Sequence, residues 1–472
     1  MKNKIIDINK KTYIAIVVML FGLMLFSILI THLISKGTFA SYTNEFGEVV
    51  FDYTKYQKLP DQSGINIFRG ICSPILVLFS QDGLSLVMLS IFILMIAGAF
   101  QVMSDTNGMN VIVCFFIDKF KNSKKLLIAI ITLIFMIFGS FFGLFEEVLS
   151  LLPLIILLAI SMGYDGFTGF LMCIVATAFG FASAITNPFT VISAASIIDV
   201  NPMYNLWFRL LVFAIMYGLI LSFIFLHTRK ISKNPEASPT FVADNKKRES
   251  YKDTSLDNSN KKVFRSYSIF LIFTLLAIIT ITSIEALRSL SVVFLIGIFL
   301  VGGMIAGSVA SGSFKATCKG FLKGMISALP TILLILMASS IKFILEEGNV
   351  LATIAHSISF FVEGKNKFVM AILIYFIIVI IEFFISSSTA KAVFVMGILA
   401  IVNIELSKDL MVLLYLFGDG YTNVLFPTSP VLLISLSMVG INYFTWIKKG
   451  KWFFLINLAL VLGLIMLAVL VY

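Results

Sequence analysis

The chain has 472 residues, of which 59% are hydrophobic and 14% aromatic, including 47 phenylalanines. Soluble domains contain about 45–50% apolar residues, so this composition excludes a soluble protein and indicates an all-α polytopic membrane protein. The net charge of +10 does not indicate nucleic-acid binding, because the lysines and arginines stand mainly at the ends of apolar segments, where they set the orientation in the lipid bilayer.

The cysteines and histidines form no pattern typical of a disulfide framework or a metal site. They are Cys72, Cys114, Cys173 and Cys318, and His32, His227 and His356. The sequence also lacks a Walker motif, a dinucleotide loop and a nucleophile constellation. We therefore expect no enzymatic activity, no cofactor and no metal other than a transported sodium ion.

The first predicted membrane helix covers residues 13 to 35 and follows four lysines, which place the N-terminus in the cytoplasm. Its apolar run from Ile14 to Ile34 is long and lacks a small-residue cleavage pattern, so we expect a retained helix. Residues 36 to 66 then lie outside the cell. An interfacial stretch at 67 to 80 leads to a second helix at 83 to 103, which returns the chain to the cytoplasm.

The next apolar segment is too short to cross. Leu126 to Gly139 has 14 residues, about 21 Å of helix against a hydrocarbon core of about 30 Å. A second arm runs from 148 to 162, after a tip that contains Glu146 and Glu147. This pattern predicts a re-entrant hairpin over 126–162 that enters from the cytoplasm and carries two carboxylates into the membrane.

The following segment, 167–198, is instead longer than a helix needs to be to cross the membrane. Its 32 residues would make about 48 Å of helix, and Pro188 in the sequence Thr-Asn-Pro interrupts it near the middle. We expect a broken helix there, followed by a helix at 204 to 226. Residues 1–228 would then form the first membrane repeat.

A charged loop is predicted between the two halves of the chain. Residues 229–265 contain ten Lys/Arg and five Asp/Glu, many Ser and Asn and few large apolar residues. This composition is typical of a solvated cytoplasmic tether.

The second half, 266–472, repeats the first after one extra helix. Helices are expected at 266 to 286, 290 to 310, 325 to 345 and 452 to 472, with an interfacial segment at 350 to 363 and a lysine-containing stretch, Lys315, Lys319 and Lys323, before the third of them. Between these lie a second hairpin at 368–402, which enters from outside, and a second broken helix at 408–440.

The breaks in the two halves resemble each other, since Thr186–Thr190 and Thr422–Thr428 both contain Thr-Asn and a proline. Because an odd helix separates the halves, the second repeat lies upside down in the membrane. The prediction is nine transmembrane helices and two opposed re-entrant hairpins in inverted repeats, with the C-terminus external.

Carboxylates inside a membrane segment usually serve an ion or substrate pathway, although Glu146 and Glu147 could also only cap the returning arm. The breaks offer hydroxyls, amides and free carbonyls, and the serine run can bind a carboxylate. The predicted substrate- or ion-binding residues are Glu146, Glu147, Thr186, Asn187, Ser386, Ser387, Ser388, Thr389, Asp419, Thr422, Asn423 and Thr428. Lys391 could neutralise a substrate, pair with Glu382 or Asp419, or extend to the surface.

Four sequence blocks resemble the signature blocks of the YfcC family of proposed basic amino acid antiporters, which are related to anaerobic four-carbon dicarboxylate carriers of the ion transporter superfamily. They are GLFEE at 143–147, GFASAITNPF at 180–189, SSST at 386–389, and FGDGYTN at 417–423 with PTS at 427–429. The resemblance implies a secondary transporter of the bacterial cell membrane, a homodimer in which a transport part moves against a scaffold by an elevator motion. The lysine at 391 departs from the small residues expected after the serine run.

The sequence therefore predicts an antiporter or ion-coupled carrier for amino acids, basic ones such as arginine and ornithine among them, or for related carboxylates. A C4-dicarboxylate carrier is the alternative, and a channel is a more remote one. The coupling ion, sodium or proton, stays open.

Overall fold

The computed structural model describes residues 10–43, 49–80, 82–119, 123–249, 258–288, 290–362, 364–385, 387–401 and 406–472. Among these residues, nine helices are long and apolar enough to cross a membrane. They are Tyr13–Leu33, Gly83–Asp105, Lys124–Phe142, Leu206–Lys233, Lys261–Ile281, Ser291–Ser311, Phe314–Glu347, Lys367–Phe384 and Tyr443–Val471. The predicted class, a polytopic helical membrane protein, is confirmed.

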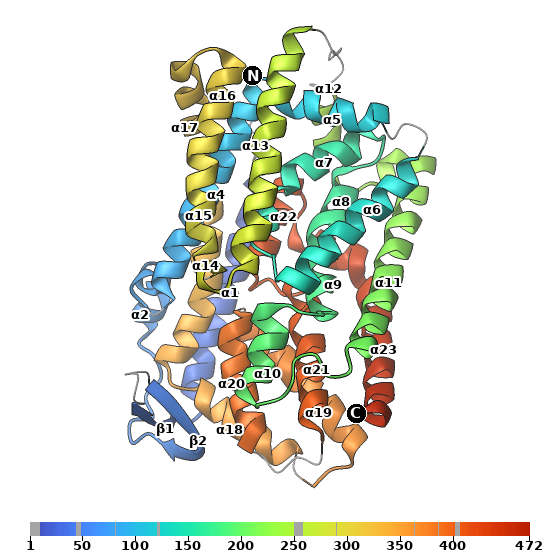
Figure 1. The fold of residues 1–472 in the computed structure, drawn as a ribbon. Coiled ribbons are helices and arrows are strands. Elements are labelled where there is room, and N and C mark those ends of the chain that lie inside the picture. Colours follow the sequence, from blue (N-terminus) through green and yellow to red (C-terminus); the bar gives the residue numbers. More distant parts are fainter. Residues whose placement is uncertain are drawn as a thin grey trace.

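The elements follow one another along the whole chain (Figure 1). In the first half they are α1 (Lys10–Leu33), β1 (Gly37–Thr43), β2 (Val49–Lys58), α2 (Ile67–Ile71), α3 (Ser73–Leu76), α4 (Gly83–Asp105), α5 (Gly108–Lys119), α6 (Lys124–Ile137), α7 (Leu152–Ser161), α8 (Gly166–Phe170), α9 (Ala176–Ala182), α10 (Ser193–Ile197) and α11 (Leu206–Lys233). In the second half they are α12 (Phe241–Glu249), α13 (Asn258–Ser283), α14 (Glu285–Arg288), α15 (Ser291–Gly297), α16 (Gly303–Ser311), α17 (Phe314–Glu347), α18 (Leu351–Val362), α19 (Lys367–Phe384), α20 (Ser388–Ile401), α21 (Lys408–Asp419), α22 (Pro430–Val439) and α23 (Tyr443–Val471).

The count of nine agrees with the sequence prediction, but two of its members differ. The first arm of the first hairpin is longer than predicted, because a π-turn, η2 (Phe138–Phe142), extends α6 into a run of 19 residues. The first arm of the second hairpin, α19, has 18 residues. Both arms are therefore long enough to span, whereas each predicted broken helix consists of two shorter pieces.

The broken helices are interrupted where the sequence has Thr-Asn and proline. Helical structure stops after Ala182 and resumes with the turn η5 (Pro188–Ile192), whose N-cap is Asn187. In the second half, α21 ends at Asp419, and α22 begins at Pro430 with Ser429 as its N-cap. Proline at the first helical position fits both restarts, since its missing N–H would be unpaired there in any case.

Two helix starts in the second half lie earlier than predicted. The helix expected at 325–345 begins at Phe314, so that Lys315, Lys319 and Lys323 are helical and do not separate two segments. The helix expected from 452 begins at Tyr443. Lysine interrupts a hydropathy pattern but is a good helix former, which explains both errors. The Ser313 and Asn442 side chains cap the two starts.

The all-α expectation needs one correction. The segment predicted to lie outside, 36–66, contains the antiparallel pair β1 and β2, in which Gly37 lies opposite Lys58 and a bulge follows Phe39. Tyr56 of β2 stacks on His356 of α18, with ring centroids 4.1 Å apart, and its hydroxyl lies 2.8 Å from the Thr353 hydroxyl. The pair lies at the same end of the molecule as α18 and the C-terminus (Figure 1).

One group of helices, which we call the scaffold side, consists of α1, α4, α15, α16 and α17. The long helix α17 packs along both α4 and α1, and α16 packs on α17 and α4. Small residues allow the close approach, since a Cβ added at Gly324 would lie 2.2 Å from the Ala97 carbonyl oxygen.

The second group, which we call the hairpin side, contains the hairpin arms and the broken helices. Here α9 packs on α6, α21 on both α9 and α19, and α10 on α20. Each broken helix therefore lies against hairpin elements, and the two halves of the chain meet where α21 contacts α9.

The central loop is more ordered than the predicted tether. Helix α11 extends to Lys233, α12 covers Phe241–Glu249, and α13 begins at Asn258. Ser238, Thr240 and Asp244 are buried although they lie in this polar stretch. These polar residues are typical of a solvated loop, but here they bond to polar groups of the membrane part. The sequence alone does not reveal such partners.

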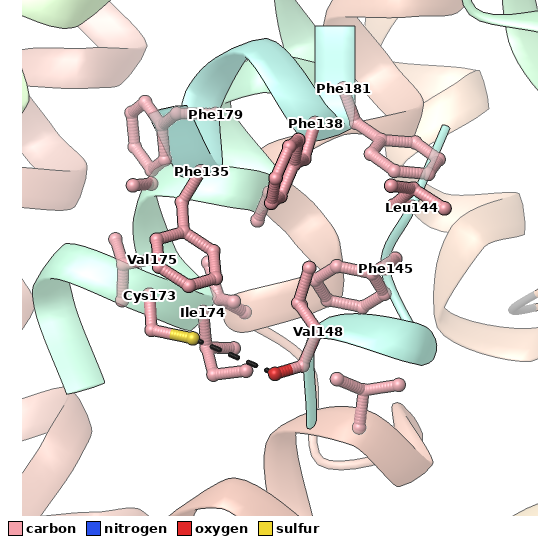
Figure 2. Close-up of a cluster of buried hydrophobic side chains, with 14 of the residues drawn as sticks. Phe135, Phe138, Leu144, Phe145, Val148, Cys173, Ile174, Val175, Phe179 and Phe181 are labelled. Carbon is pink, nitrogen blue, oxygen red and sulfur yellow. Dashed lines mark hydrogen bonds between the residues drawn. The ribbon is translucent and has the colours of Figure 1, made fainter. Parts of the chain in front are cut away.

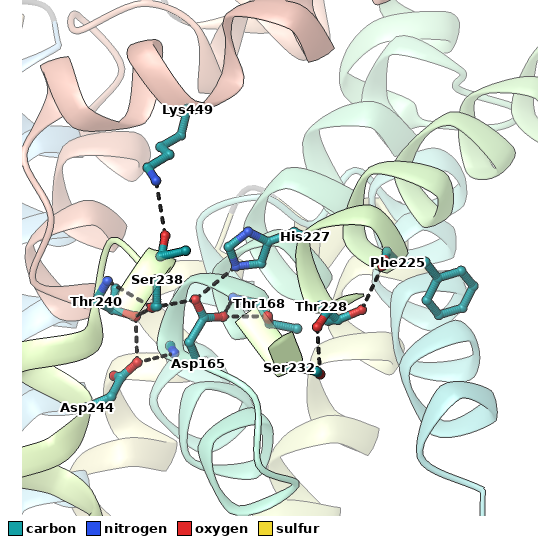
Figure 3. A network of polar contacts seen from close by, with 12 residues as sticks. Asp165, Thr168, Phe225, His227, Thr228, Ser232, Ser238, Thr240, Asp244 and Lys449 are labelled. Carbon is teal, nitrogen blue, oxygen red and sulfur yellow. Dashed lines mark hydrogen bonds and ion pairs between the residues drawn. The ribbon is translucent and has the colours of Figure 1, made fainter. Parts of the chain in front are cut away.

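A buried polar network holds this segment (Figure 3). The Ser238 hydroxyl donates to Asp165 at 2.7 Å, His227 Nε2 lies 2.9 Å from the same carboxylate, and the Gly166 N–H donates to Asp244 at 2.8 Å. Burial alone would raise the pKa of Asp165, but the hydrogen bonds from His227, Ser238 and Thr168 outweigh it and hold this pKa below its ordinary value. These hydrogen bonds connect the central loop to the junction of α7 and α8.

Candidate functional site

A cavity of about 400 Å³ lies between the scaffold side and the hairpin side. The scaffold side contributes residues of α4, α15 and α17, and the hairpin side contributes both hairpin tips, the second break, and Phe181 and Phe189 of the first broken helix. Its polar lining consists of Asp82, Ser85, Glu146, Glu147, Ser291, Ser339, Lys342, Ser387, Ser388, Asn423, Thr428 and Ser429. The scaffold side contributes five of these polar residues, and the sequence analysis predicted none of them as a site residue. They are Asp82, Ser85, Ser291, Ser339 and Lys342.

The tip of the first hairpin packs on a cluster of buried apolar side chains (Figure 2). Gly143 ends η2 in the left-handed region, with φ of +69°, and the Leu144 N–H donates to the Phe138 carbonyl at 3.1 Å. The Phe145 ring then packs edge to face on Phe181 of α9, with centroids 5.6 Å apart. This anchoring fixes the chain direction just before the two glutamates.

The structure gives Glu146 and Glu147 different surroundings. Glu147 is buried, and the Ser291 hydroxyl of α15 donates to its Oε1 at 3.3 Å. Glu146 is half-buried, and its carboxylate has no hydrogen-bond or ion-pair partner within the described part of the chain. Both line the cavity. Glu147 therefore contacts the scaffold side, while Glu146 is the carboxylate available to a solute.

The polar side chains of the first break, Thr186 and Asn187, bond to the hairpin and do not line the cavity, although Phe189 does. The Asn187 amide donates to the Gly139 carbonyl at 2.9 Å and accepts from the Phe189 N–H at 2.9 Å. Thr186 donates to the Phe141 carbonyl at 3.1 Å. These bonds satisfy carbonyls at the end of the first hairpin arm, so the side chains of Thr186 and Asn187 join two segments of the hairpin side.

The second break does reach the cavity. The Asn423 amide nitrogen donates to the Asp419 backbone carbonyl at 2.7 Å, and Asn423 lines the cavity. Thr428 also lines it, and its buried hydroxyl has no partner among the described residues. Thr422 is fully buried and donates to the Gly418 carbonyl at 2.7 Å, so its hydroxyl is used within the turn.

The predicted serine run is only partly described. Ser386 lies outside the described residues, and Thr389 is helical in α20 with a side chain that is not described. Ser387 and Ser388 line the cavity. The Ser388 hydroxyl lies 3.0 Å from both carboxylate oxygens of Asp419, which places Asp419 directly behind the second tip.

Lys391 forms ion pairs with both Glu382 and Asp419, which is the pairing alternative of the sequence prediction. The side chains of Lys391 and Asp419 are 0% exposed, and that of Glu382 is 2% exposed, so none of them reaches the cavity surface. Glu382 was named from the sequence only as a partner for the lysine.

Lys342 is the cavity's cation in the described part of the chain, and sequence analysis missed it. It forms ion pairs with Asp82 and, at 3.2 Å, with Glu346. The only signal was a lysine four residues before Glu346 near a helix end, a spacing typical of an ordinary surface pair. Because Lys342 already pairs with Asp82 and Glu346, it is not available to the two hairpin glutamates.

This arrangement suits a zwitterionic or cationic solute. Glu146 offers a carboxylate to an ammonium or guanidinium group, and Asn423, Thr428, Ser387 and Ser388 offer amide and hydroxyl groups to the polar remainder. Among the described residues, no group of three His, Cys, Asp or Glu side chains could hold a metal ion.

The model of the DcuC family, described as the C4-dicarboxylate anaerobic carrier, matches residues 14–472. The protein named "Putative basic amino acid antiporter YfcC" of Escherichia coli (strain K12) is 25% identical over 88% of this chain and 84% of its own length. An uncharacterized protein of Haemophilus influenzae is 24% identical over 76% of this chain and 70% of its own length.

Two solved transporter structures are similar over nearly the whole chain. The YdaH transporter of Alcanivorax borkumensis has a TM-score of 0.41 at 17% identity and covers 95% of this chain and 96% of its own. MtrF of Neisseria gonorrhoeae, whose structure is described with a class of antimetabolite efflux pumps, has a TM-score of 0.45 at 14% identity and covers 97% of this chain and 95% of its own.

Proposed function

The chain belongs to the C4-dicarboxylate anaerobic carrier family, and from this premise we propose that it is a secondary transporter of basic amino acids in the bacterial cell membrane. The observation that carries the proposal is the charge of the cavity. Glu146 and Glu147 line it, and neither forms an ion pair among the described residues, since Lys342 in the same lining pairs with Asp82 and Glu346. In their ionised form these carboxylates repel an anion and attract a positively charged side chain, which in turn favours the ionised form.

The name of the Escherichia coli relative, which is 25% identical, supports the same substrate class and an exchange mechanism. A basic amino acid would place its ammonium or guanidinium at Glu146. Its carboxylate would face the hydroxyl and amide groups of Thr428, Ser387 and Asn423. Exchange of one such cation for another moves no net charge, which suits an antiporter.

A C4-dicarboxylate is the second candidate, because the family description names it. Ser387, Ser388, Asn423 and Thr428 could donate to carboxylates, and Lys342 lies in the same wall. In this case Glu146 would have to be protonated or bound to a cation, because a dianion and an ionised glutamate in one cavity repel each other.

Exchange across reconstituted vesicles distinguishes the candidates. We expect internal unlabelled arginine or ornithine to stimulate uptake of labelled arginine, with saturable kinetics, while succinate neither stimulates nor inhibits. Stimulation by succinate alone would replace the basic substrate with the dicarboxylate. Uptake of labelled arginine that is unaffected by internal substrate would indicate a channel.

We further propose that the hairpins and broken helices move as one body against the scaffold side. The position of the cavity between these two groups supports this motion. We also propose a cytoplasmic N-terminus, a cytoplasmic central loop and an external C-terminus, supported by the position of α12 and of the C-terminus at opposite ends of the molecule (Figure 1).

The orientation can be measured in intact cells. In a background without the native cysteines, Lys230→Cys is exposed at the end of α11 and should react only after a reagent enters the cytoplasm. A reporter fused after Tyr472 should be active only outside. Labelling of Lys230→Cys by an impermeant reagent would reverse the proposed orientation.

A further inference from the structure

A buried charged triad lies behind the second hairpin tip. It consists of Glu382 on α19, Lys391 on α20 and Asp419 at the end of α21, and the ammonium forms ion pairs with both carboxylates. The three side chains are almost completely removed from solvent. With one ammonium and two carboxylates, the fully ionised triad carries a net charge of −1 in a site that water does not reach.

A buried charge without a counterion is unfavourable, and such a group takes up a proton instead of remaining ionised. A sodium ion is a poor alternative here, because the Lys391 ammonium already lies between the two carboxylates and would repel it. A proton adds directly to a carboxylate oxygen and needs no additional space. We propose that Glu382, Lys391 and Asp419 form a proton-binding site that couples transport to the pH gradient, an inference that rests on the proposed transport function.

The triad is connected to the cavity through Asp419. Ser388, a cavity-lining residue, has its hydroxyl 3.0 Å from both oxygens of this carboxylate. Asn423, which also lines the cavity, donates to the backbone carbonyl of Asp419 at 2.7 Å. A solute that draws the Ser388 hydroxyl or the Asn423 amide away removes a hydrogen bond at Asp419. Solute binding and proton binding are therefore linked, and the linkage acts in both directions.

Few other titratable groups are close enough to replace the triad in this role. Nearby are Tyr415 of α21, which donates to the Ser388 carbonyl, and Tyr375 of α19, which is hydrogen-bonded to Tyr421. The packed segments α9, η5 and α10 carry no titratable side chain.

Other charged groups on elements packed against α20 and α21 have partners outside the triad. Asp409, in the first turn of α21, interacts with Arg209 and with Tyr472 of α23, about 15 Å along the helix from Asp419. Where α18 and β2 meet α20, His356 stacks on Tyr56. The lysines of α23 lie in its first three turns, and Lys449 donates to the Ala237 carbonyl of the central loop.

The proton balance of the site is simple. A hydronium ion in the cavity gives a proton to the Ser388 oxygen and becomes water, while the Ser388 hydroxyl passes its own proton to a carboxylate oxygen of Asp419, and the new O–H bond neutralises the triad. When the hairpin side faces the opposite compartment, this O–H bond breaks, its electron pair stays on the carboxylate, and the proton returns to water. No group is oxidised or reduced.

Glu382→Gln tests the proposal, since it keeps the shape of the side chain but leaves a neutral Lys391–Asp419 pair with no proton to exchange. In vesicles, we expect the variant to exchange labelled substrate at equal pH but to lose accumulation driven by a pH gradient. Glu382→Asp, which retains the carboxylate, should restore accumulation. Glu236→Gln, an exposed position in the central loop, is the matched control and should behave as wild type.

A second measurement does not depend on the substrate. Infrared spectra of the purified protein in lipid should contain the carbonyl stretch of a protonated carboxylic acid that disappears in Glu382→Gln or in Asp419→Asn. Absence of this band, or accumulation that survives in Glu382→Gln, overturns the proton site. Loss of exchange together with accumulation also overturns it, because the triad would then only support the structure. A band in wild type without any exchange of basic amino acids would instead refute the proposed substrate and leave the proton site standing.

Discussion

Replacing Glu146 with glutamine is expected to weaken the binding of arginine or ornithine by about 10- to 150-fold. The substitution keeps the shape of the side chain and removes its charge, and the loss of a hydrogen bond to a charged group costs about 1.5–3 kcal/mol, at about 1.4 kcal/mol per tenfold change in affinity. Titration calorimetry of the purified variant measures this change directly.

Glu147→Gln is the informative comparison. Because the Ser291 hydroxyl of the scaffold side donates to Glu147, its loss should mainly change the rate of transport, with a smaller effect on affinity. Glu236→Gln, on the exposed loop, should leave both unchanged. Equal affinities for wild type and Glu146→Gln would remove this residue from the substrate site. An equal loss in both hairpin variants would mean that the pair binds the cation together.

Replacing Lys391 with methionine is expected to destabilise the protein by about 3–5 kcal/mol, the usual cost of removing one partner from a buried ion pair. The fully buried ammonium pairs with both Glu382 and Asp419, and methionine of similar length would leave both carboxylates without a cation. Unfolding of the purified variant in denaturant should therefore occur at a clearly lower concentration than for wild type.

A triple variant, Lys391→Met with Glu382→Gln and Asp419→Asn, should regain most of the lost stability, because its buried groups carry no charge. Lys342→Met provides a matched control. Lys342 also pairs with two carboxylates, but Asp82 and Glu346 are 44% and 43% exposed, so water compensates its loss and the cost should be about 0–1 kcal/mol. Equal stability of Lys391→Met and wild type would show that the triad does not depend on its ammonium.

The sequence by itself determined the membrane class, seven of the nine long apolar helices, and the two places where a helix is broken. These features depend on neighbours along the chain. The length of an apolar segment decides whether its helix can cross the bilayer. A proline after Thr-Asn lacks a backbone N–H and interrupts the helix, whatever packs against it. The restart at Pro188 could therefore be assigned before any contact was known.

Only the tertiary structure decided which polar side chains face the cavity. Glu146 and Glu147 are adjacent in sequence, yet one contacts Ser291, which is 144 residues away, and the other does not. Asn187 and Asn423 occupy matching positions in the two breaks, but Asn187 is used by the Gly139 carbonyl and Asn423 lines the cavity.

The same limit applies to the charged residues that the sequence left open or missed. Lys391 pairs with carboxylates on two other helices, and Lys342 meets Asp82 from a distant segment. Asp244, in the predicted tether, accepts a hydrogen bond from the Gly166 N–H, 78 residues away. A charge has no preferred partner in sequence, because its energy depends on burial and on the nearest opposite charge, and both are fixed only when helices from the two halves pack together.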